Sequence, residues 1–379
     1  MAQNLKIGIV GYPTYGGSGV VATELGKALA DKGHEIHFIT YSQPVRLGAL
    51  KKNIRYHEVN VSDYPLFLYP PYELVLASKM VDVVKYEKLD LLHVHYAIPH
   101  ASAAITAKQV LAEEGINLPV ITTLHGTDIT LLGKDSSFEP VISFAINKSD
   151  AVTAVSQSLR LDTYKLFGIN REIEVIPNFI NTEKMHFPNR DEVHKEYAPN
   201  GEKILVHISN FRPVKRVLDV IDTFNLVKAK HPSKLIMVGD GPERTKAEFR
   251  CRELGLCDDV LFLGNVKNPA EALAVADLFL LPSEAESFGL AALEAMACGV
   301  PVISTNTGGL PEVNRHGVTG MMSHVGDVED MAKNALYIIE DESRLNKFRV
   351  KAKERAAEFS IEKILPQYEA LYNSVLETV

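Results

Sequence analysis

The chain has 379 residues, of which 46% are hydrophobic and 23% are charged. These proportions are typical of globular domains with full cores and exclude a disordered, collagenous or disulfide-scaffold chain. The formal net charge is −8, which disfavours a nucleic-acid reader, because such a protein needs a dominant basic surface. The cysteines Cys251, Cys257 and Cys298 fit neither a disulfide framework nor a zinc spacing. No stretch has the pattern of a signal peptide or a membrane span, so we expect a cytoplasmic protein.

Runs rich in Ile and Val alternate with helical patterns along the chain, which is typical of parallel α/β architecture. In the first half we predict strands at 6–10, 34–40, 54–59, 89–95, 119–125, 151–155 and 173–177, and helices at 19–32, 72–87, 99–113, 138–147 and 156–167. In the second half we predict strands at 204–209, 234–239, 260–264, 278–283 and 301–305, and helices at 217–230, 242–254, 269–275, 290–298, 327–340 and 342–358.

This order predicts two Rossmann-like domains, each a doubly wound parallel sheet. We place the first domain at residues 1–180 and the second at residues 181–360. The polar segment 178–202, which holds Pro188 and Pro199, is the expected hinge. The amphipathic stretch 361–379 is expected to form a last helix that packs back on the first domain.

Ligands of open α/β sheets bind outside the carboxyl ends of the strands, so the loops after the strands matter most. The first such loop, GYPTYGGSG (11–19), places Gly16, Gly17 and Gly19 before a helix. This pattern suits an anion, because glycines let the backbone approach a ligand and leave N–H groups free. It is not the dinucleotide fingerprint, since the spacing is G-G-x-G and no acidic residue closes the second strand.

Two loops of the second half carry the same kind of signal. In SNFRPVKR (209–216), the cations Arg212, Lys215 and Arg216 suit a phosphate or diphosphate in the expected inter-domain cleft. VGDGP (238–242) is another turn from a strand into glycine that would line the same crevice. Asn210 and Gly239 of these loops are further candidates for contact with the same phosphate-bearing ligand.

The segment SEAESFGLAALEAMACGVPVIST (283–305) is the most informative. Glu286 precedes a predicted helix that starts at Leu290, and Glu294 lies one turn inside it. A nucleotide-sugar can span this element, with hexose hydroxyls on Glu286, the diphosphate on the amides of 288–290, and ribose hydroxyls on Glu294.

Histidines follow two strands of the first half. LHGTDIT (124–130) places His125 and Asp128 at a strand end, and HVHYAIPHA (93–101) does the same for His93, His95 and His100. For His93, His95 and His100 we favour a structural role, in the core or in hydrogen bonds. His125, beside a glycine in a Thr-rich loop, is the better functional candidate. No grouping has the spacing of a metal site.

The Glu286-x7-Glu294 element, SNFRPVKR, VGDGP and TNTGGLPEV (305–313) together resemble family 4 of the retaining glycosyltransferases, which have the GT-B fold. Further motifs, among them YPTYGGSG and TTLHGTDIT, are similar to a branch of that family that moves N-acetylglucosamine from UDP-N-acetylglucosamine to L-malate in bacillithiol biosynthesis. The resemblance implies a metal-independent hexosyltransferase with no cofactor and no nucleic-acid or membrane partner, and it is compatible with a homo-oligomer.

The resemblance also implies residue roles. Glu286 would hold the 3- and 4-hydroxyls of the donor hexose and Glu294 the uridine ribose, while His125 would lie beside the anomeric centre. The implied diphosphate and donor contacts are Lys215, Arg212, Gly16, Gly17, Ser18, Asn210, Gly239, Phe288, Gly289 and Leu290. Residues 1–180 would bind the acceptor and residues 181–360 the nucleotide-sugar. The acceptor candidates are Ser18, Tyr96, Thr122 and Thr123.

Two departures from the family's pattern leave questions open. Where many members have G-R-L, this chain has Ser209-Asn210-Phe211, so Arg212 takes the arginine role. The cation that faces malate is unassigned, with Lys148 or Arg160 as candidates.

Three other functions remain as alternatives to transfer onto malate. They are transfer of a sugar to a lipid or polysaccharide acceptor, a nucleotide-sugar epimerase, and a non-catalytic nucleotide-sugar sensor.

Overall fold

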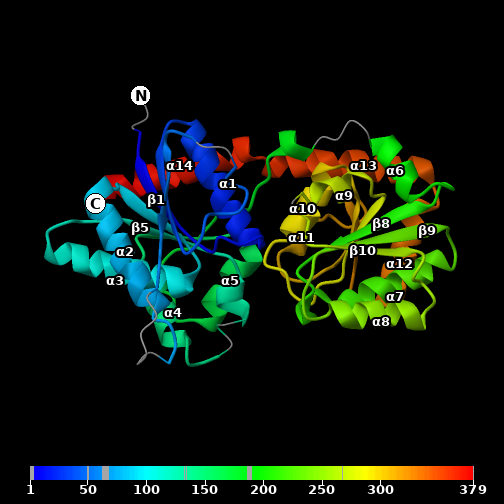
Figure 1. Ribbon diagram of the computed structural model, residues 1–379, viewed down its shortest axis with the longest axis horizontal. Helices are drawn as coiled ribbons and strands as arrows, with labels where there is room; N and C mark the ends of the chain where they lie inside the picture. The colour runs from blue at the N-terminus through cyan, green and yellow to red at the C-terminus, as the bar shows by residue number, and fades with distance from the viewer. Residues whose placement is uncertain are drawn as a thin grey trace. The chain divides into compact units, whose positions relative to one another are not determined.

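A computed structural model describes residues 4–48, 51–61, 68–131, 133, 135–185, 190–266 and 268–378. The chain divides into two compact units, Met1–Asn178 with Ile361–Val379, and Phe179–Ser360 (Figure 1). Each unit has a parallel sheet of its own.

The first unit is built around a parallel sheet with the strand order β3-β2-β1-β4-β5-β6-β7. Its strands are β1 (Lys6–Val10), β2 (Glu35–Thr40), β3 (Ile54–Glu58), β4 (Leu91–His95), β5 (Val120–Leu124), β6 (Ala151–Ala154) and β7 (Glu174–Val175). Its helices are α1 (Gly17–Asp31), α2 (Tyr72–Glu87), α3 (Ser102–Glu113), α4 (Glu139–Lys148), α5 (Gln157–Leu166) and α14 (Ile361–Thr378). The central strands β4 and β5 are fully buried, although each carries two polar residues, which hydrogen-bond within the core.

The second unit is built around a parallel sheet with the order β10-β9-β8-β11-β12-β13. Its strands are β8 (Lys203–Ile208), β9 (Ser233–Val238), β10 (Val260–Gly264), β11 (Leu278–Leu281), β12 (Val302–Thr305) and β13 (Gly320–Ser323). Its helices are α6 (Arg190–Tyr197), α7 (Val217–Lys228), α8 (Arg244–Glu253), α9 (Ala270–Ala274), α10 (Leu290–Ala297), α11 (Leu310–Val313), α12 (Val328–Ile339) and α13 (Glu342–Ala356). One core cluster packs α7, α12 and α13 against the sheet around Phe224, Leu280 and Leu345.

The strand order reverses at one place in each sheet, between β1 and β4 and between β8 and β11. At such a switch point the loops after the two central strands diverge to opposite faces and leave room for a ligand. The loops that start at Gly11 and Tyr96 therefore flank one switch point, and those that start at Ser209 and Pro282 flank the other.

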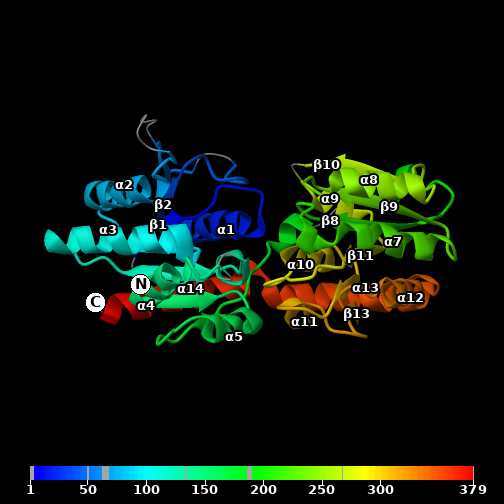
Figure 2. The ribbon, with the colours of Figure 1, turned by 90° about the horizontal axis from the view of Figure 1, so that it is seen from below.

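The last helix, α14, belongs to the first unit (Figure 2). It packs against α1, and the rings of its fully buried Tyr368 and Tyr372 lie beside His93 of β4. Pro366 lies inside this helix without ending it. The buried residues of α14 recur at helical spacing along one face, and this burial explains the amphipathic pattern of the sequence.

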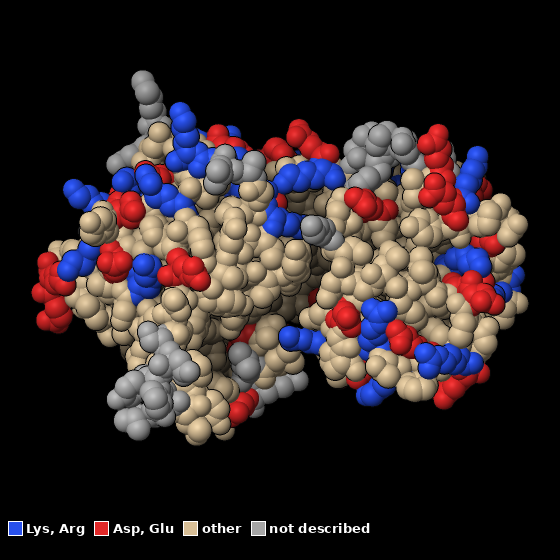
Figure 3. All heavy atoms as spheres, viewed as in Figure 1, with Lys and Arg blue, Asp and Glu red and all other residues tan. Residues whose placement is uncertain are grey.

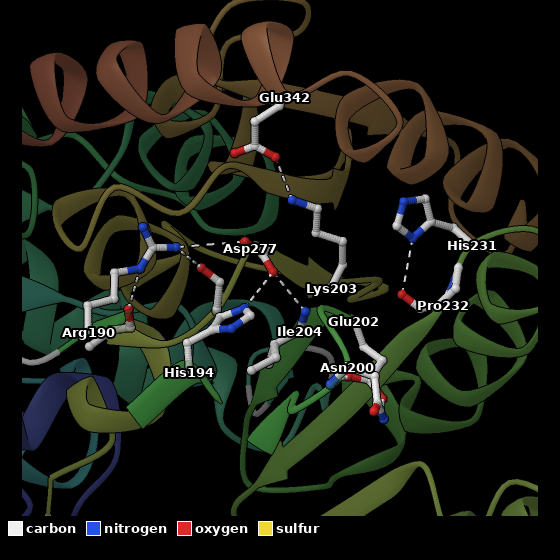
Figure 4. Close-up of polar contacts among 12 residues, drawn as sticks. Arg190, His194, Asn200, Glu202, Lys203, Ile204, His231, Pro232, Asp277 and Glu342 are labelled. Carbon is white, nitrogen blue, oxygen red and sulfur yellow. Dashed lines mark hydrogen bonds and ion pairs between the residues drawn. The ribbon is translucent and has the colours of Figure 1, made fainter. Parts of the chain in front are cut away.

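The segment 178–202, which we predicted to be a hinge, contains a helix that the sequence analysis missed. In α6, Arg190 and His194 approach the buried Asp277 of the second unit, with atoms 3.8 and 3.1 Å apart (Figure 4). Burial alone would raise the pKa of Asp277, but hydrogen bonds from His194 and the Ile204 amide outweigh it and lower that pKa. Half of the expected hinge is therefore anchored to its own sheet. Pro188 lies outside the described residues.

Acidic and basic side chains are interspersed on the visible face of each unit, as the modest net charge leads one to expect (Figure 3). Among the residues that the structure describes, none of the helices combines the length and apolarity needed to cross a bilayer.

Candidate functional site

In the second unit, the loops after β8 and β11 bring Lys215 and Glu286 together. The Lys215 ammonium group contacts Oε1 of Glu286, and the buried Ser283 hydroxyl donates to the same oxygen at 3.1 Å. The two loops are also joined through the backbone, where the Glu284 amide donates to the Val214 carbonyl at 2.8 Å. Lys215 and Glu286 lie 71 positions apart in the sequence and belong to separate motifs, yet they form one charged pair. The Ser283 hydroxyl fixes the carboxylate of this pair.

Close backbone packing holds this pair in place. Gly239 has φ +117°, and a Cβ there would lie 1.8 Å from the Ser209 carbonyl oxygen. Gly308 has φ +56°, and a Cβ there would lie 2.0 Å from the carbonyl oxygen of Glu286. Only glycine fits where two backbones approach so closely. The glycine motifs after β9 and β12 therefore position the loops that carry Lys215 and Glu286.

The remaining donor candidates differ in exposure. Arg212 and Asn210 are exposed on the loop after β8, whereas Glu294 is 8% exposed in the second turn of α10. Gly289 precedes α10 with φ +94°, and the first backbone bond of the helix runs from the Leu293 amide to the Gly289 carbonyl. The amides of 288–290 thus stand at the helix N-terminus, where an anion is favoured.

One cation of the predicted cluster has another role. Nε of Arg216 donates to Asp219 at 2.7 Å, across the start of α7. Arg216 is therefore held by its own helix, whereas Lys215 contacts Glu286 of the neighbouring loop and Arg212 is exposed.

In the first unit, the loops after β1, β4 and β5 gather neutral groups. Nε2 of His125 lies 2.8 Å from Nδ1 of His95, and both histidines are buried. Burial lowers the pKa of His125 to about 3 and holds the pKa of His95 well below its ordinary value. Both imidazoles are therefore neutral at pH 7 and act as hydrogen-bonding groups.

Ser18 and Tyr96 are joined by a hydrogen bond of 2.8 Å between their hydroxyl groups. The Tyr96 ring also lies 5.3 Å from that of His125, with a positive φ of +86° at Tyr96. The structure thus brings together three of the first unit's candidates. Gly16 and Gly17 lie exposed at the start of α1, directly before Ser18.

Asp128 is a buried carboxylate that holds the loops carrying Tyr96 and His125. It is fully buried and accepts hydrogen bonds from the amides of Ala97 and Gly126, at 2.8 and 2.9 Å. Burial raises the pKa of Asp128 to about 6, although those bonds favour its charged form. Its carboxylate ties the loop after β4 to the loop after β5.

Thr122 and Thr123 do not join the surface that Ser18 and Tyr96 form. Both are fully buried on β5, and neighbouring residues of a strand point to opposite faces of the sheet. The Thr122 hydroxyl bonds Ser149 at 2.8 Å, and the Thr123 hydroxyl bonds His93 at 2.7 Å. In this structure both hydroxyls bond within the core, so the structure does not bring them together with Ser18 and Tyr96.

Sequence reasoning missed the partners behind these residues. His93 bonds the Tyr372 hydroxyl of α14 at 2.7 Å, so the last helix stabilises the histidine cluster. No local pattern links residues 279 positions apart. The only available signal was the run of His93, His95 and His100 next to an amphipathic last helix.

The comparisons with known proteins agree with this geometry. Residues 15–184 match the family model described as Glycosyltransferase Family 4, and residues 189–357 match that described as Glycosyl transferases group 1. The chain belongs to this family of glycosyltransferases, with two parallel-sheet domains of the GT-B fold. The predicted fold class and family are confirmed.

Two relatives differ widely in their similarity to this chain. N-acetyl-alpha-D-glucosaminyl L-malate synthase of Bacillus anthracis is 52% identical over 378 residues, which cover 99% of this chain and 98% of that protein. An uncharacterized glycosyltransferase of Methanocaldococcus jannaschii is 26% identical over 347 residues, with 86% of each chain covered.

Among solved structures, Anabaena HepE in complex with UDP and glucose matches with a TM-score of 0.81 and 22% identity, covering 98% of this chain and all of that one. A sucrose-phosphate synthase from Thermosynechococcus elongatus matches with the same TM-score of 0.81, with 21% identity over 99% of this chain and all of that one. At this identity the likeness establishes the fold.

Proposed function

We propose that this glycosyltransferase moves N-acetylglucosamine from UDP-N-acetylglucosamine to the hydroxyl of L-malate, with retention at the anomeric carbon and without a metal ion. The observation that carries the proposal is the 52% identity, over almost the whole chain, to a relative named for this product. The Lys215–Glu286 pair and the neutral histidine cluster supply groups that suit such a reaction.

On the donor side, Lys215 and Arg212 bind the diphosphate together with the amides at the start of α10. Glu286 accepts hydrogen bonds from the hexose hydroxyls, and Glu294 from the ribose. As the bond from C1 to the diphosphate oxygen breaks, negative charge grows on the leaving group. Fixed cations and amides stabilise that charge, and this kind of preorganised electrostatics is usually the largest catalytic contribution.

At the anomeric centre we favour front-face substitution. The malate hydroxyl approaches from the face that the diphosphate leaves, the new C1–O bond forms there, and the proton passes to the departing β-phosphate. His125 is neutral, and His95 occupies its Nε2, so its other ring nitrogen, Nδ1, is the atom we assign to the substrate.

Of the two cations considered for malate, the structure favours Arg160. It lies in the first turn of α5, directly after the carboxyl end of β6, where ligands of a parallel sheet bind. Its Nε is buried and has no hydrogen-bond partner among the described residues. Lys148, by contrast, is exposed at the end of α4, just before the amino end of β6 and therefore away from the carboxyl ends of the strands.

The test is UDP release from UDP-N-acetylglucosamine with and without L-malate, with the mass of the product determined. Malate-dependent release with glycosylated malate supports the proposal. Release without malate indicates hydrolysis or epimerase-like chemistry. If no UDP is released, the malate proposal fails, and other sugars and lipid or polysaccharide acceptors are tested next.

The same assay tests the metal-free scheme. We expect EDTA to leave malate-dependent turnover unchanged, because Lys215, Arg212 and the α10 amides take the place of a divalent cation at the diphosphate. A loss of turnover that Mg²⁺ restores would contradict this scheme.

A further inference from the structure

The outer strands of the first sheet carry a cluster that the proposed reaction does not use. Among the described residues, His37 of β2, His57 of β3 and Glu87 at the end of α2 each offer a ligand atom, and these atoms lie within 4.8 Å of one another. His37 pairs with Arg55 in the sheet register and Ile39 pairs with His57, so both histidines point to the same face. The three residues are 20 and 30 positions apart, which is why no sequence spacing revealed them.

The two imidazoles already have nearly the spacing of two ligands on one ion. Nδ1 of His37 lies 2.9 Å from Nε2 of His57, and the rings are stacked with an angle of 12° between their planes. Two nitrogens at about 2.1 Å from a tetrahedral Zn²⁺ are about 3.4 Å apart. A shift of about half an ångström therefore separates the hydrogen-bonded pair from a pair that binds a metal.

The other nitrogen of His37 has the surroundings of a metal-binding histidine. His37 is fully buried, and within the described part of the chain its Nε2 makes no well-aligned hydrogen bond. The nearest acceptor is Oε1 of Glu35, 3.3 Å away, and Nε of Arg55 holds that carboxylate at 2.8 Å. Metal-binding histidines usually direct their second N–H to a carboxylate, which fixes the tautomer with a lone pair toward the metal.

Charged groups of both signs surround the two imidazoles. They are three carboxylates, Glu35, Glu87 and Asp82, and three cations, Arg55, Lys79 and Lys6.

We propose that His37, His57 and Glu87 bind one Zn²⁺ ion, with water completing the tetrahedron. Two imidazoles and a carboxylate form the mixed nitrogen and oxygen donor set that zinc accepts. The ion links β2, the edge strand β3 and the end of α2, so its role is to stabilise the outer part of the first sheet. The site is separate from the candidate active site, whose residues follow β1, β4 and β5, and it does not depend on the proposed reaction.

The test uses the untagged, full-length protein after removal of metals with a chelator. Titration calorimetry with ZnCl₂ is expected to show one equivalent bound, and the melting temperature is expected to rise by roughly 5–10 °C at a hundredfold excess over Kd. Co²⁺ in place of Zn²⁺ is expected to give the strong visible absorption of a tetrahedral site. Malate-dependent turnover is expected to stay the same with and without Zn²⁺.

Four variants identify the ligands. Glu87→Gln and His57→Gln are expected to abolish the bound equivalent and the rise in melting temperature, and neither changes the fully buried ring of His37. Glu35→Gln is expected to weaken Zn²⁺ by roughly 10–100-fold, since it loses the carboxylate behind His37. The control is His231→Gln in the second unit, where the ring contacts only the neighbouring Pro232 carbonyl in the structure as described.

Two results would overturn the proposal. One is the absence of a bound equivalent in the wild-type protein. The other is the same Kd in the wild type, Glu87→Gln and His57→Gln, which would place any Zn²⁺ elsewhere on the chain.

Discussion

The two units present their candidate residues in opposite ways. In the second unit the groups are charged and partly exposed, and loops packed on glycine hold them, as Lys215 and Glu286 illustrate. In the first unit they are neutral and buried, and hydrogen bonds between side chains hold them, as His95 and His125 illustrate. In the proposed reaction, the charged groups of the second unit bind the diphosphate and the neutral groups around His125 orient the sugar, while Arg160 is the one charged group that we assign to the acceptor.

The two arrangements respond differently to change. A partly exposed ion pair contributes little to folding, so removing one of its partners mainly affects binding and catalysis. A buried neutral histidine contributes to stability only while it stays uncharged, so pH affects the fold through it. Loss of a partner of the Lys215–Glu286 pair should therefore act on turnover, and acid should destabilise the first unit through its buried histidines.

The largest expected effect is that of Lys215→Ala. Loss of the cation that faces the leaving diphosphate should lower kcat by roughly 100–1000-fold, the range seen when one group that stabilises developing charge is removed. The melting temperature should change little, because Lys215 is about one-fifth exposed and its pair with Glu286 is partly solvated. Steady-state kinetics and thermal melting measure both.

The matched control for that variant is Lys230→Ala, at an exposed lysine after α7 in the same unit. It should leave kcat unchanged. Equal turnover for Lys215→Ala and Lys230→Ala would remove Lys215 from the site and end the contrast between the two units.

Gly239→Ala is expected to act on the position of the donor loop. Its Cβ would overlap the Ser209 carbonyl, so the loop must move, and we expect a loss of about 3 kcal/mol in unfolding free energy with a raised KM for the donor. Gly255→Ala is the control. It also has a positive φ (+67°), but a Cβ would meet no described atom within 4 Å, so only about 1 kcal/mol should be lost. Equal losses, measured by urea unfolding, would show that strain rather than close packing fixes Gly239.

Arg160→Ala tests how the first unit receives its acceptor. A lost charged hydrogen bond corresponds to roughly 10–100-fold in affinity, so we expect KM for malate to rise by that factor while KM for the donor stays the same. Lys148→Ala is the matched control and should change neither constant. A malate KM that rises for Lys148→Ala alone would reverse the assignment.

Local patterns predicted the elements and the second unit's residues better than those of the first unit. Lys215, Glu286 and Gly239 lie in short motifs at strand ends, so the sequence alone predicted which loops carry them, and the structure brings Lys215 and Glu286 into contact. The helix α6 was missed because its polar residues bury little apolar surface and its Arg190 and His194 depend on Asp277, more than 80 residues away. The burial of Thr122 and Thr123 was not predicted, because nothing local shows that their hydroxyls bond His93 and Ser149.

The last effect depends on pH and concerns His100, whose ring packs on Tyr12 and whose Nδ1 bonds the His95 carbonyl at 2.6 Å. Burial lowers the pKa of His100 from 6.5 to about 4. A lowered folded pKa means that the unfolded chain binds one more proton between these values. This contribution to stability is therefore complete above pH 6.5 and is lost as the pH falls toward 4, by about 1.4 kcal/mol per pH unit.

His100→Gln should make the fall in unfolding free energy shallower by that amount, since glutamine keeps a donor for the carbonyl but takes up no proton. Urea unfolding of both proteins across that pH range measures the difference, to which His93, His95 and His125 contribute equally in the two proteins. Asp128 has the opposite sign, because its raised pKa of about 6 gives stability that is complete below pH 3.8 and is lost as the pH rises through 6. Parallel slopes for wild type and variant would mean that His100 titrates in the folded protein as it does in the unfolded chain, and that the first unit's cluster is open to protons.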